Sequence, residues 1–229
     1  MKIELINSMG DDLTVVNAAR VSFDKESAWE AIPHAGPIHN LLLEKDIKLI
    51  NYLSKHNHFT PFTHCTITMR ETVPLFVARQ RFKHTIGFSY NEVSRRYVNG
   101  VPEFYFPKEW RAKAGNAKQG SSEETIDINS VGDRPPPFLD IYEVAIKKCK
   151  DTYKELLEKG VCPEQARMVL PQSMYTSYYV TGSLYAWARA YNLRSDVNAQ
   201  KEIQDIAKSW DDICKELFPT SWEALKTNV

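Results

Sequence analysis

The stretch CTITMRETVPLFVARQRFKHTIGFSYNEVSRRY, residues 65–97, holds the strongest structural and chemical signals of this chain. Its first part, residues 65–73, alternates Thr and Arg with apolar residues, a pattern that predicts a β-strand. Pro74 suits the first turn of a helix, and the LFVARQRFKH that follows predicts that helix. The stretch therefore predicts a strand that leads directly into a helix.

The second part, residues 79–97, is strongly cationic although the whole chain is neutral, with 29 basic and 29 acidic residues. His84 and one acid, Glu92, accompany five permanent cations: Arg79, Arg81, Lys83, Arg95 and Arg96. A local cationic cluster in a neutral protein indicates one small anionic ligand rather than a long polyanion. Short polar side chains within the cluster can orient such a ligand: Ser89, Asn91, Ser94 and Tyr97.

The overall composition narrows the class of protein. A chain of 229 residues that is 43% hydrophobic and 25% charged is typical of a globular protein. Zero net charge disfavours general nucleic-acid or membrane-surface binding. No apolar run predicts a signal peptide or a membrane span, so we expect a cytoplasmic protein. The cysteines are scattered and predict neither a zinc site nor a disulfide framework: Cys65, Cys149, Cys162 and Cys214.

Hydrophobic periodicity predicts an α+β fold. We expect strands at residues 2–7, 65–73 and 173–181, and helices from Asp12 and over residues 43–56, 75–84, 138–159, 163–170, 183–193 and 199–217. Strands and helices do not alternate as βαβ units, which favours a single mixed domain over residues 1–229. Its central sheet is expected to be largely antiparallel and flanked by helices, with a helix-rich C-terminal half. Residues 111–137 are poor in large apolar groups and predict a mobile surface loop within that domain.

Further arginines later in the chain can join the cationic cluster. Glu164 and Arg167 are three residues apart at a helix start, and Arg189 and Arg194 flank the end of the next helix. Guanidinium groups bind phosphate through a planar, bidentate fork. There is no GxGxxG or GxxxxGK[ST] motif, so neither a Rossmann site nor a P-loop is predicted. Three histidines in HNHFTPFTH lack a carboxylate at ligand spacing, so no metal is expected.

The segment KHTIGFSYNEVSRRY resembles the signature of flavin-dependent thymidylate synthases, an RHR followed by a spaced S…N-E-x-S-x-R-Y. Six further blocks resemble family blocks in the family order, and together they cover nearly the whole chain outside residues 111–137. They are NAARVSF (17–23), HNHFTPFTH (56–64), PLFVARQ (74–80), PEFYFP (102–107), CPEQARMVLP (162–171) and NLRSDVNAQ (192–200).

The resemblance implies an activity and its co-reactants. This family converts dUMP to dTMP by reductive methylation, with carbon from 5,10-methylenetetrahydrofolate and hydride from FAD that NADPH has reduced. Family members are homotetramers with active sites shared between subunits, and they need no cysteine nucleophile. The expected partners are therefore dUMP, a folate and further copies of the chain, with no nucleic acid and no membrane.

The resemblance also implies roles for individual residues. The positions that match dUMP contacts are Gln80, Glu92, Ser94, Arg95, Arg96, Arg167 and Arg194. Among them Ser94 and the arginines are expected around the phosphate. Arg194 matches the catalytic arginine beside the uracil ring, where it stabilises negative charge rather than acting as a base. The positions that match flavin contacts are Ser22, His58, Thr60, Lys83, His84, Thr85, Ile86, Glu92 and Asn198.

The chain departs from the family pattern at the flavin positions. Lys83-His84-Thr85 replaces Arg-His-Arg, and Asn198 stands where a histidine is common. Ser183 and Tyr185 replace commoner polar or basic residues. These departures leave two alternatives open, a related pyrimidine nucleotide hydroxymethylase and a nucleotide-binding regulator that has lost flavin chemistry.

Overall fold

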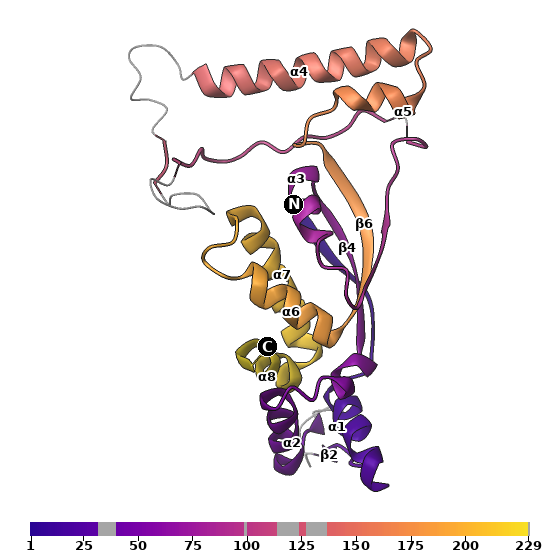
Figure 1. Ribbon diagram of the computed structural model, residues 1–229, viewed down its shortest axis with the longest axis vertical. Helices are drawn as coiled ribbons and strands as arrows, with labels where there is room; N and C mark the ends of the chain where they lie inside the picture. The colour runs from indigo at the N-terminus through magenta and orange to yellow at the C-terminus, as the bar shows by residue number, and fades with distance from the viewer. Residues whose placement is uncertain (32–39, 99, 114–123, 127–136, 229) are drawn as a thin grey trace. The chain divides into compact units, whose positions relative to one another are not determined.

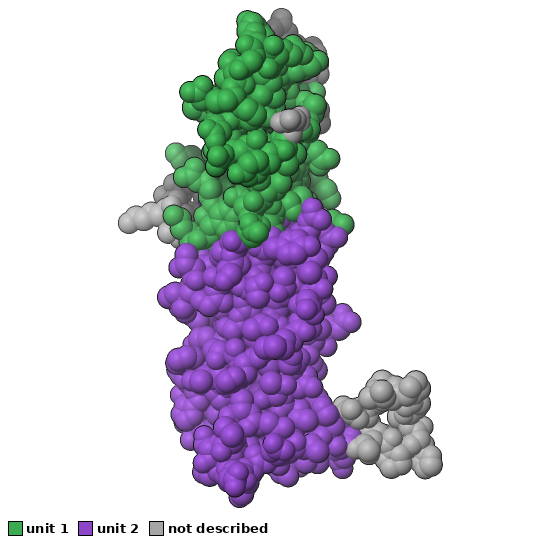
Figure 2. Space-filling model, turned by 90° about the vertical axis from the view of Figure 1, so that its right-hand side faces the viewer, with its two compact units in different colours: residues 1–2, 72–83, 91–178 green, residues 3–71, 84–90, 179–229 purple. Residues whose placement is uncertain are grey.

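The computed structural model describes residues 1–31, 40–98, 100–113, 124–126 and 137–228. These residues form two compact units, which are coloured separately in Figure 2. Unit 1 comprises residues 1–2, 72–83 and 91–178, and unit 2 comprises residues 3–71, 84–90 and 179–229. The single domain expected over residues 1–229 stays a prediction.

The fold is α+β, as expected (Figure 1). A four-stranded antiparallel sheet has the strand order β1-β4-β6-β5, and β2 pairs with β3 in a separate two-stranded sheet. The strands are β1 (Lys2–Met9), β2 (Glu30–Ala31), β3 (Asn40–Leu41), β4 (Thr66–Pro74), β5 (Phe88–Glu92) and β6 (Tyr175–Ser183). The helices are α1 (Asp12–Arg20), α2 (Glu44–Lys55), α3 (Leu75–Arg81), α4 (Pro137–Glu158), α5 (Pro163–Ala166), α6 (Leu184–Arg194), α7 (Lys201–Leu217) and α8 (Pro219–Asn228). Short 3₁₀ helices lie at η1 (Val21–Phe23), η2 (Thr60–His64) and η3 (Arg167–Val169).

The core of unit 1 joins α4 to the extended segment around residue 104. Phe104, Ile146 and Met174 are buried together, and Tyr142 packs against them. The Tyr142 hydroxyl also donates a hydrogen bond to the carbonyl of Tyr105 at 2.6 Å. The buried face of α4 differs from the apolar stripe that the sequence predicts, because Ile141 is 63% exposed.

The core of unit 2 is built around tryptophans that are fully buried on α6, α7 and α8. The Trp187 Nε1–H donates to the carbonyl of Ile67 at 3.2 Å, and the Trp210 Nε1–H donates to the Glu71 carboxylate at 2.9 Å. Both acceptors belong to β4, so these bonds fasten α6 and α7 to this strand. Helix α8 begins where the backbone N–H groups of Thr220 and Ser221 donate to the Asp12 carboxylate, at 2.8 and 2.9 Å.

The structure corrects several expected boundaries. The helix after β4 ends at Arg81 instead of residue 84, and Pro74 is its N-cap rather than part of its first turn. Strands β2, β3 and β5 and helix α8 were not predicted. Within the expected loop 111–137, Arg111 forms an antiparallel bridge with Thr125. Residues 114–123 and 127–136 of that loop lie outside the described residues.

Helices long and apolar enough to cross a membrane do not occur in the part of the chain that the structure describes.

Candidate functional site

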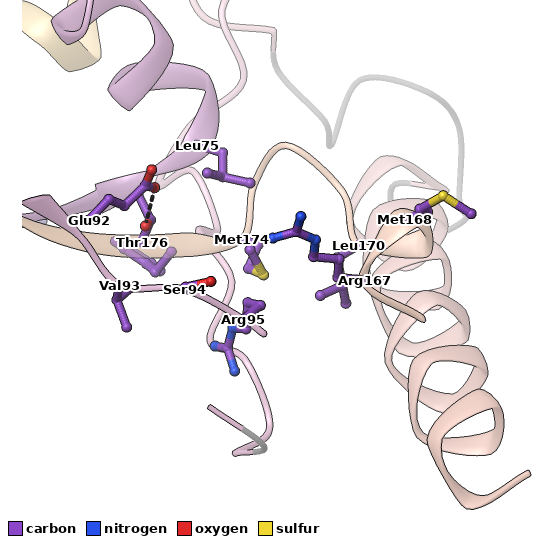
Figure 3. A pocket seen from close by; sticks show the side chains of 11 residues that line it. Leu75, Glu92, Val93, Ser94, Arg95, Arg167, Met168, Leu170, Met174 and Thr176 are labelled. Carbon is purple, nitrogen blue, oxygen red and sulfur yellow. Dashed lines mark hydrogen bonds between the residues drawn. The ribbon is translucent and has the colours of Figure 1, made fainter. Parts of the chain in front are cut away.

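Unit 1 contains a pocket of about 430 Å³, within the range of small-ligand sites (Figure 3). Four elements supply its walls: the end of β5 with the turn that follows, the start of α3, η3, and the start of β6. Its lining residues are Leu75, Glu92, Val93, Ser94, Arg95, Arg167, Met168, Leu170, Met174, Tyr175 and Thr176. Four of the predicted dUMP contacts are therefore brought together here.

The apolar floor of the pocket is continuous with the core of unit 1. Met174 is a member of the buried cluster, and Leu75 and Leu170 pack against that cluster. The backbone fixes the same floor, because the N–H of Leu75 donates to the carbonyl of Met174 at 2.9 Å. Side chains that are held by core packing change position little when a ligand arrives, so this floor is preformed.

The cationic end of the pocket consists of Ser94, Arg95 and Arg167. Each guanidinium is oriented by a backbone carbonyl: Arg95 Nη1 donates to Gly100 at 2.6 Å, and Arg167 Nε donates to Glu164 at 3.3 Å. The Ser94 hydroxyl accepts the N–H of Arg96 at 3.3 Å and can still donate its own proton. Two permanent cations and a hydroxyl donor form a suitable binding site for a phosphate monoester.

Glu92, at the end of β5, supplies a negatively charged hydrogen-bond acceptor to the pocket. Its carboxylate accepts a hydrogen bond from the Thr176 hydroxyl at 2.5 Å, drawn as the dashed line in Figure 3. Thr176 was not among the predicted site residues. A signal for it exists in the sequence: Thr176 falls on the buried side of an alternating strand, where a hydroxyl needs a partner. The pocket therefore has a cationic end and a carboxylate that accepts hydrogen bonds.

Two other predicted dUMP residues of unit 1 are not in the pocket wall. The side chain of Arg96 forms an ion pair with Glu164, with Nε and Oε1 2.5 Å apart. The Gln80 Nε2–H donates to the carbonyl of Phe76 within α3, at 3.4 Å. In this conformation Arg96 is directed to a neighbouring carboxylate, and the assignment of both residues to dUMP stays a prediction.

The predicted catalytic residue, Arg194, lies in unit 2 at the end of α6. Its Nε donates a hydrogen bond to Nε2 of His84 at 2.9 Å. Because a guanidinium is only a donor, His84 Nε2 must accept, which requires a neutral imidazole with its proton on Nδ1. The Tyr90 hydroxyl also donates to the carbonyl of His84, at 2.7 Å. Arg194, a predicted substrate contact, and His84, a predicted flavin contact, are thus hydrogen-bonded to each other.

The turn that carries His84 lies tightly against α6. Gly87 has a φ of +78°, and a Cβ atom there would approach the Cβ of Ala186 to 2.8 Å. A residue with a side chain would be strained by its backbone conformation and would also collide with the helix. Gly87 therefore allows the close packing that places His84 within reach of Arg194.

The predicted flavin positions of unit 2 are mostly exposed. Ser22 lies on η1, Thr60 begins η2, Ile86 follows His84, and Asn198 follows α6. Helix η2 packs against α1 and α6, and the Phe59 ring lies 5.3 Å from the Tyr185 ring. His58, also exposed, has its ring 5.9 Å from that of Tyr52.

This set of side chains fits a flavin chemically. Its hydroxyl, amide and imidazole groups can form hydrogen bonds with a polar cofactor. Lys83, also predicted as a flavin contact, is exposed in unit 1. Phe23 and Ile86 are both 74% exposed and offer apolar surface that a planar ring system can cover. Thr85 is exposed as well.

The His, Cys, Asp and Glu side chains of the described residues decide whether metal or thiol chemistry is available. No group of three or more His, Cys, Asp or Glu side chains that could hold a metal occurs among them. Burial raises the pKa of the Cys65 thiol to about 12 and also raises that of Cys214. Neither thiol is activated as a nucleophile. Cys149 is partly buried, and Cys162 is exposed.

Comparison with known proteins identifies the family. The family described as "Thymidylate synthase complementing protein" matches residues 4–220. Proteins named flavin-dependent thymidylate synthase are 40% identical in Thermosipho africanus, over 97% of this chain and 89% of the relative, and 34% identical in Thermus thermophilus, over 99% and 76%. A crystal structure of a UMP/dUMP methylase PolB from Streptomyces cacaoi, bound with 5-Br UMP, superposes with a TM-score of 0.80 at 26% identity, over 99% of this chain and 93% of that one. The chain belongs to the flavin-dependent thymidylate synthase family.

Proposed function

We propose that this protein converts dUMP to dTMP by reductive methylation. In this proposal 5,10-methylenetetrahydrofolate donates the carbon, FAD is the flavin, and NADPH is the reductant. The working form is a homotetramer whose active sites are shared between subunits. Family membership supports the reaction, and the observation that carries the nucleotide assignment is the pocket that contains Ser94, Arg95 and Arg167.

The pocket chemistry matches a nucleoside monophosphate. A phosphate monoester carries close to two negative charges near neutral pH, and the two guanidinium groups balance that charge. Glu92 repels phosphate and accepts hydrogen bonds, so it suits a hydroxyl or N–H group elsewhere on the nucleotide. The volume of about 430 Å³ is adequate for one small ligand. The ligand thus binds with its phosphate at the arginines.

The proposed role of Arg194 is electrostatic. A guanidinium stays protonated at any accessible pH, so Arg194 cannot remove a proton from the uracil. It stabilises negative charge that develops on the ring, and the hydrogen bond to His84 fixes its orientation before the substrate binds. FAD, when bound, supplies the reducing equivalents, and the residues proposed to hold it are Ser22, His58, Thr60, Lys83, His84, Thr85, Ile86, Glu92 and Asn198.

An absorbance spectrum of the purified protein, followed by titration with dUMP, tests the proposal first. We expect flavin bands near ~450 nm that shift when dUMP is added, since the cofactor contacts its substrate. Addition of 5,10-methylenetetrahydrofolate and NADPH should then yield dTMP. A protein that stays colourless after incubation with FAD and makes no dTMP would contradict the proposal.

A second candidate substrate is UMP, because the Streptomyces cacaoi relative is described as a UMP/dUMP methylase. Parallel assays with dUMP and UMP separate the two, and mass spectrometry of the product also separates methylation from hydroxymethylation. We expect dUMP to be preferred. If UMP is turned over as fast as dUMP or faster, UMP would be the proposed substrate instead of dUMP.

A further inference from the structure

The hydrogen bond between Thr176 and Glu92 is the most informative contact in the pocket that the proposed mechanism does not use. The Thr176 side chain is 4% exposed, whereas Glu92 is exposed at the end of β5. The Thr176 hydroxyl donates to Glu92 Oε1 at 2.5 Å, and both residues line the pocket. A buried hydroxyl thus reaches out to a solvent-facing carboxylate.

Because Thr176 is buried and Glu92 is exposed, the hydrogen bond constrains the two side chains to different extents. A hydroxyl on a largely buried residue gains most by keeping its hydrogen bond to a protein acceptor, and a hydrogen bond to a charged carboxylate is stronger than one to a neutral acceptor. An exposed glutamate, by contrast, is otherwise free to sample several rotamers in solvent. Thr176 therefore restricts Glu92 more than Glu92 restricts Thr176.

We propose that Thr176 is a positioning residue for nucleotide binding, an inference that rests on the proposed function. Its hydroxyl holds Oε1 of Glu92, and this leaves Oε2 available to accept a hydrogen bond from a donor of the nucleotide. The donor is a sugar hydroxyl or the ring N–H, because the phosphate is attracted to Arg95 and Arg167 and repelled by Glu92. Thr176 thereby fixes the orientation of the nucleotide without contacting the reacting atoms.

The substitution Thr176→Val tests this role with little risk to folding. Valine has nearly the same shape as threonine and suits a strand. The carboxylate that loses its donor is exposed, so no unpaired buried group remains. We expect the Kd for dUMP to rise on the order of tenfold, because a charge-assisted bond no longer orders Glu92. Thr176→Ser keeps the hydroxyl and should bind dUMP within about twofold of the unchanged protein.

A double-mutant cycle separates positioning from a purely structural role. If Thr176 acts through Glu92, the Glu92→Ala/Thr176→Val protein should bind dUMP no more weakly than Glu92→Ala alone. The proposal would be overturned if the losses of dUMP affinity in the two single variants multiply in the double variant. It would also be overturned if T176V binds dUMP normally, or if T176S binds dUMP as weakly as T176V. Thermal unfolding of each variant checks that the fold is retained.

The same measurements distinguish this inference from the proposed function. If the unchanged protein neither binds dUMP nor forms dTMP, the proposed function fails and Thr176 has no nucleotide to position. If the unchanged protein binds dUMP and forms dTMP but T176V matches it in Kd, only the role of Thr176 fails.

Discussion

The proposed nucleotide pocket of unit 1 and the predicted flavin positions of unit 2 differ in how most of their side chains are held. In the pocket, the polar side chains are held by named partners: Arg95 by Gly100, Arg167 by Glu164, and Glu92 by Thr176. Among the flavin positions, Ser22 and Ile86 are exposed to solvent. The side chains of the pocket are thus held in place by contacts within one chain, whereas most side chains at the predicted flavin positions are exposed to solvent.

This difference suggests where each ligand gains its binding energy. A preorganised pocket loses little side-chain entropy when its ligand binds. An exposed set of groups gains affinity only when something covers it, and in the proposed homotetramer that cover is a second subunit. We therefore expect dUMP binding to depend on individual side chains, and flavin binding to depend on assembly.

The largest expected effect comes from Arg194, which lies in unit 2 at the end of α6. Arg194→Ala should lower kcat by about 100-fold or more, since it removes a preorganised charge that is proposed to act on the uracil ring. Flavin content should change less than kcat, because Arg194 contacts only one proposed flavin residue, His84, and is not itself a proposed flavin contact. Turnover and the absorbance of the bound flavin are measured on the same preparation.

The control for Arg194 is His84, which accepts its hydrogen bond. His84→Gln can retain an acceptor near the position of Nε2, and His84→Ala cannot. The Gln variant should therefore keep more of kcat than the Ala variant. An Arg194→Ala protein that loses flavin in proportion to its activity would contradict the electrostatic role proposed for Arg194.

Arg167→Ala should give the next largest effect, on dUMP affinity. Loss of one charge-assisted bond to phosphate costs about 1.5–3 kcal/mol, or roughly 10- to 100-fold in Kd. Lys154→Ala on α4 is the matched control, since it removes one cation of unit 1 that does not line the pocket. Isothermal titration with dUMP measures both, and equal affinities for the two variants would argue against the phosphate assignment.

Arg96→Ala should have a smaller effect, about threefold or less on dUMP affinity, because an exposed ion pair contributes little. Its Nε already pairs with Glu164 and does not line the pocket. Glu164→Ala frees Arg96 and should leave dUMP binding unchanged or slightly tighter. A loss in R96A as large as that in R167A would mean that Arg96 leaves Glu164 to bind the phosphate.

The fold was largely predictable from local patterns. Residues 199–217 show a strong apolar stripe at helical spacing, and α7 buries Ile203, Ile206 and Trp210 as that stripe indicates. Strand β5 was not predicted, because FSYNE is short and mostly polar and becomes a strand only by pairing with β6. Helix α8 was not predicted either, and its start depends on Asp12, which is distant in sequence.

The site was predictable in its residue types and less so in its contacts. Glu92, Ser94, Arg95 and Arg167, which the family resemblance assigns to dUMP, line one pocket, and their contacts with dUMP stay a prediction. Periodicity cannot show that Arg96 turns to Glu164 or that Arg194 bonds to His84, because both pairs join segments far apart in the chain. Such pairings depend on tertiary packing, which no local pattern encodes.

The smallest expected effect concerns the cysteines and tests whether the chemistry avoids a thiol nucleophile. Cys162 is exposed, whereas Cys65 and Cys214 are buried and have raised thiol pKa values. A thiol reagent at pH 8 should therefore modify Cys162 first and leave Cys65 and Cys214 intact until the protein unfolds, because the thiolate is the reactive form. Peptide mapping of the modified protein identifies the sites. Cys162→Ser should retain full dTMP formation, and a large loss of turnover in that variant would show that a thiol takes part after all.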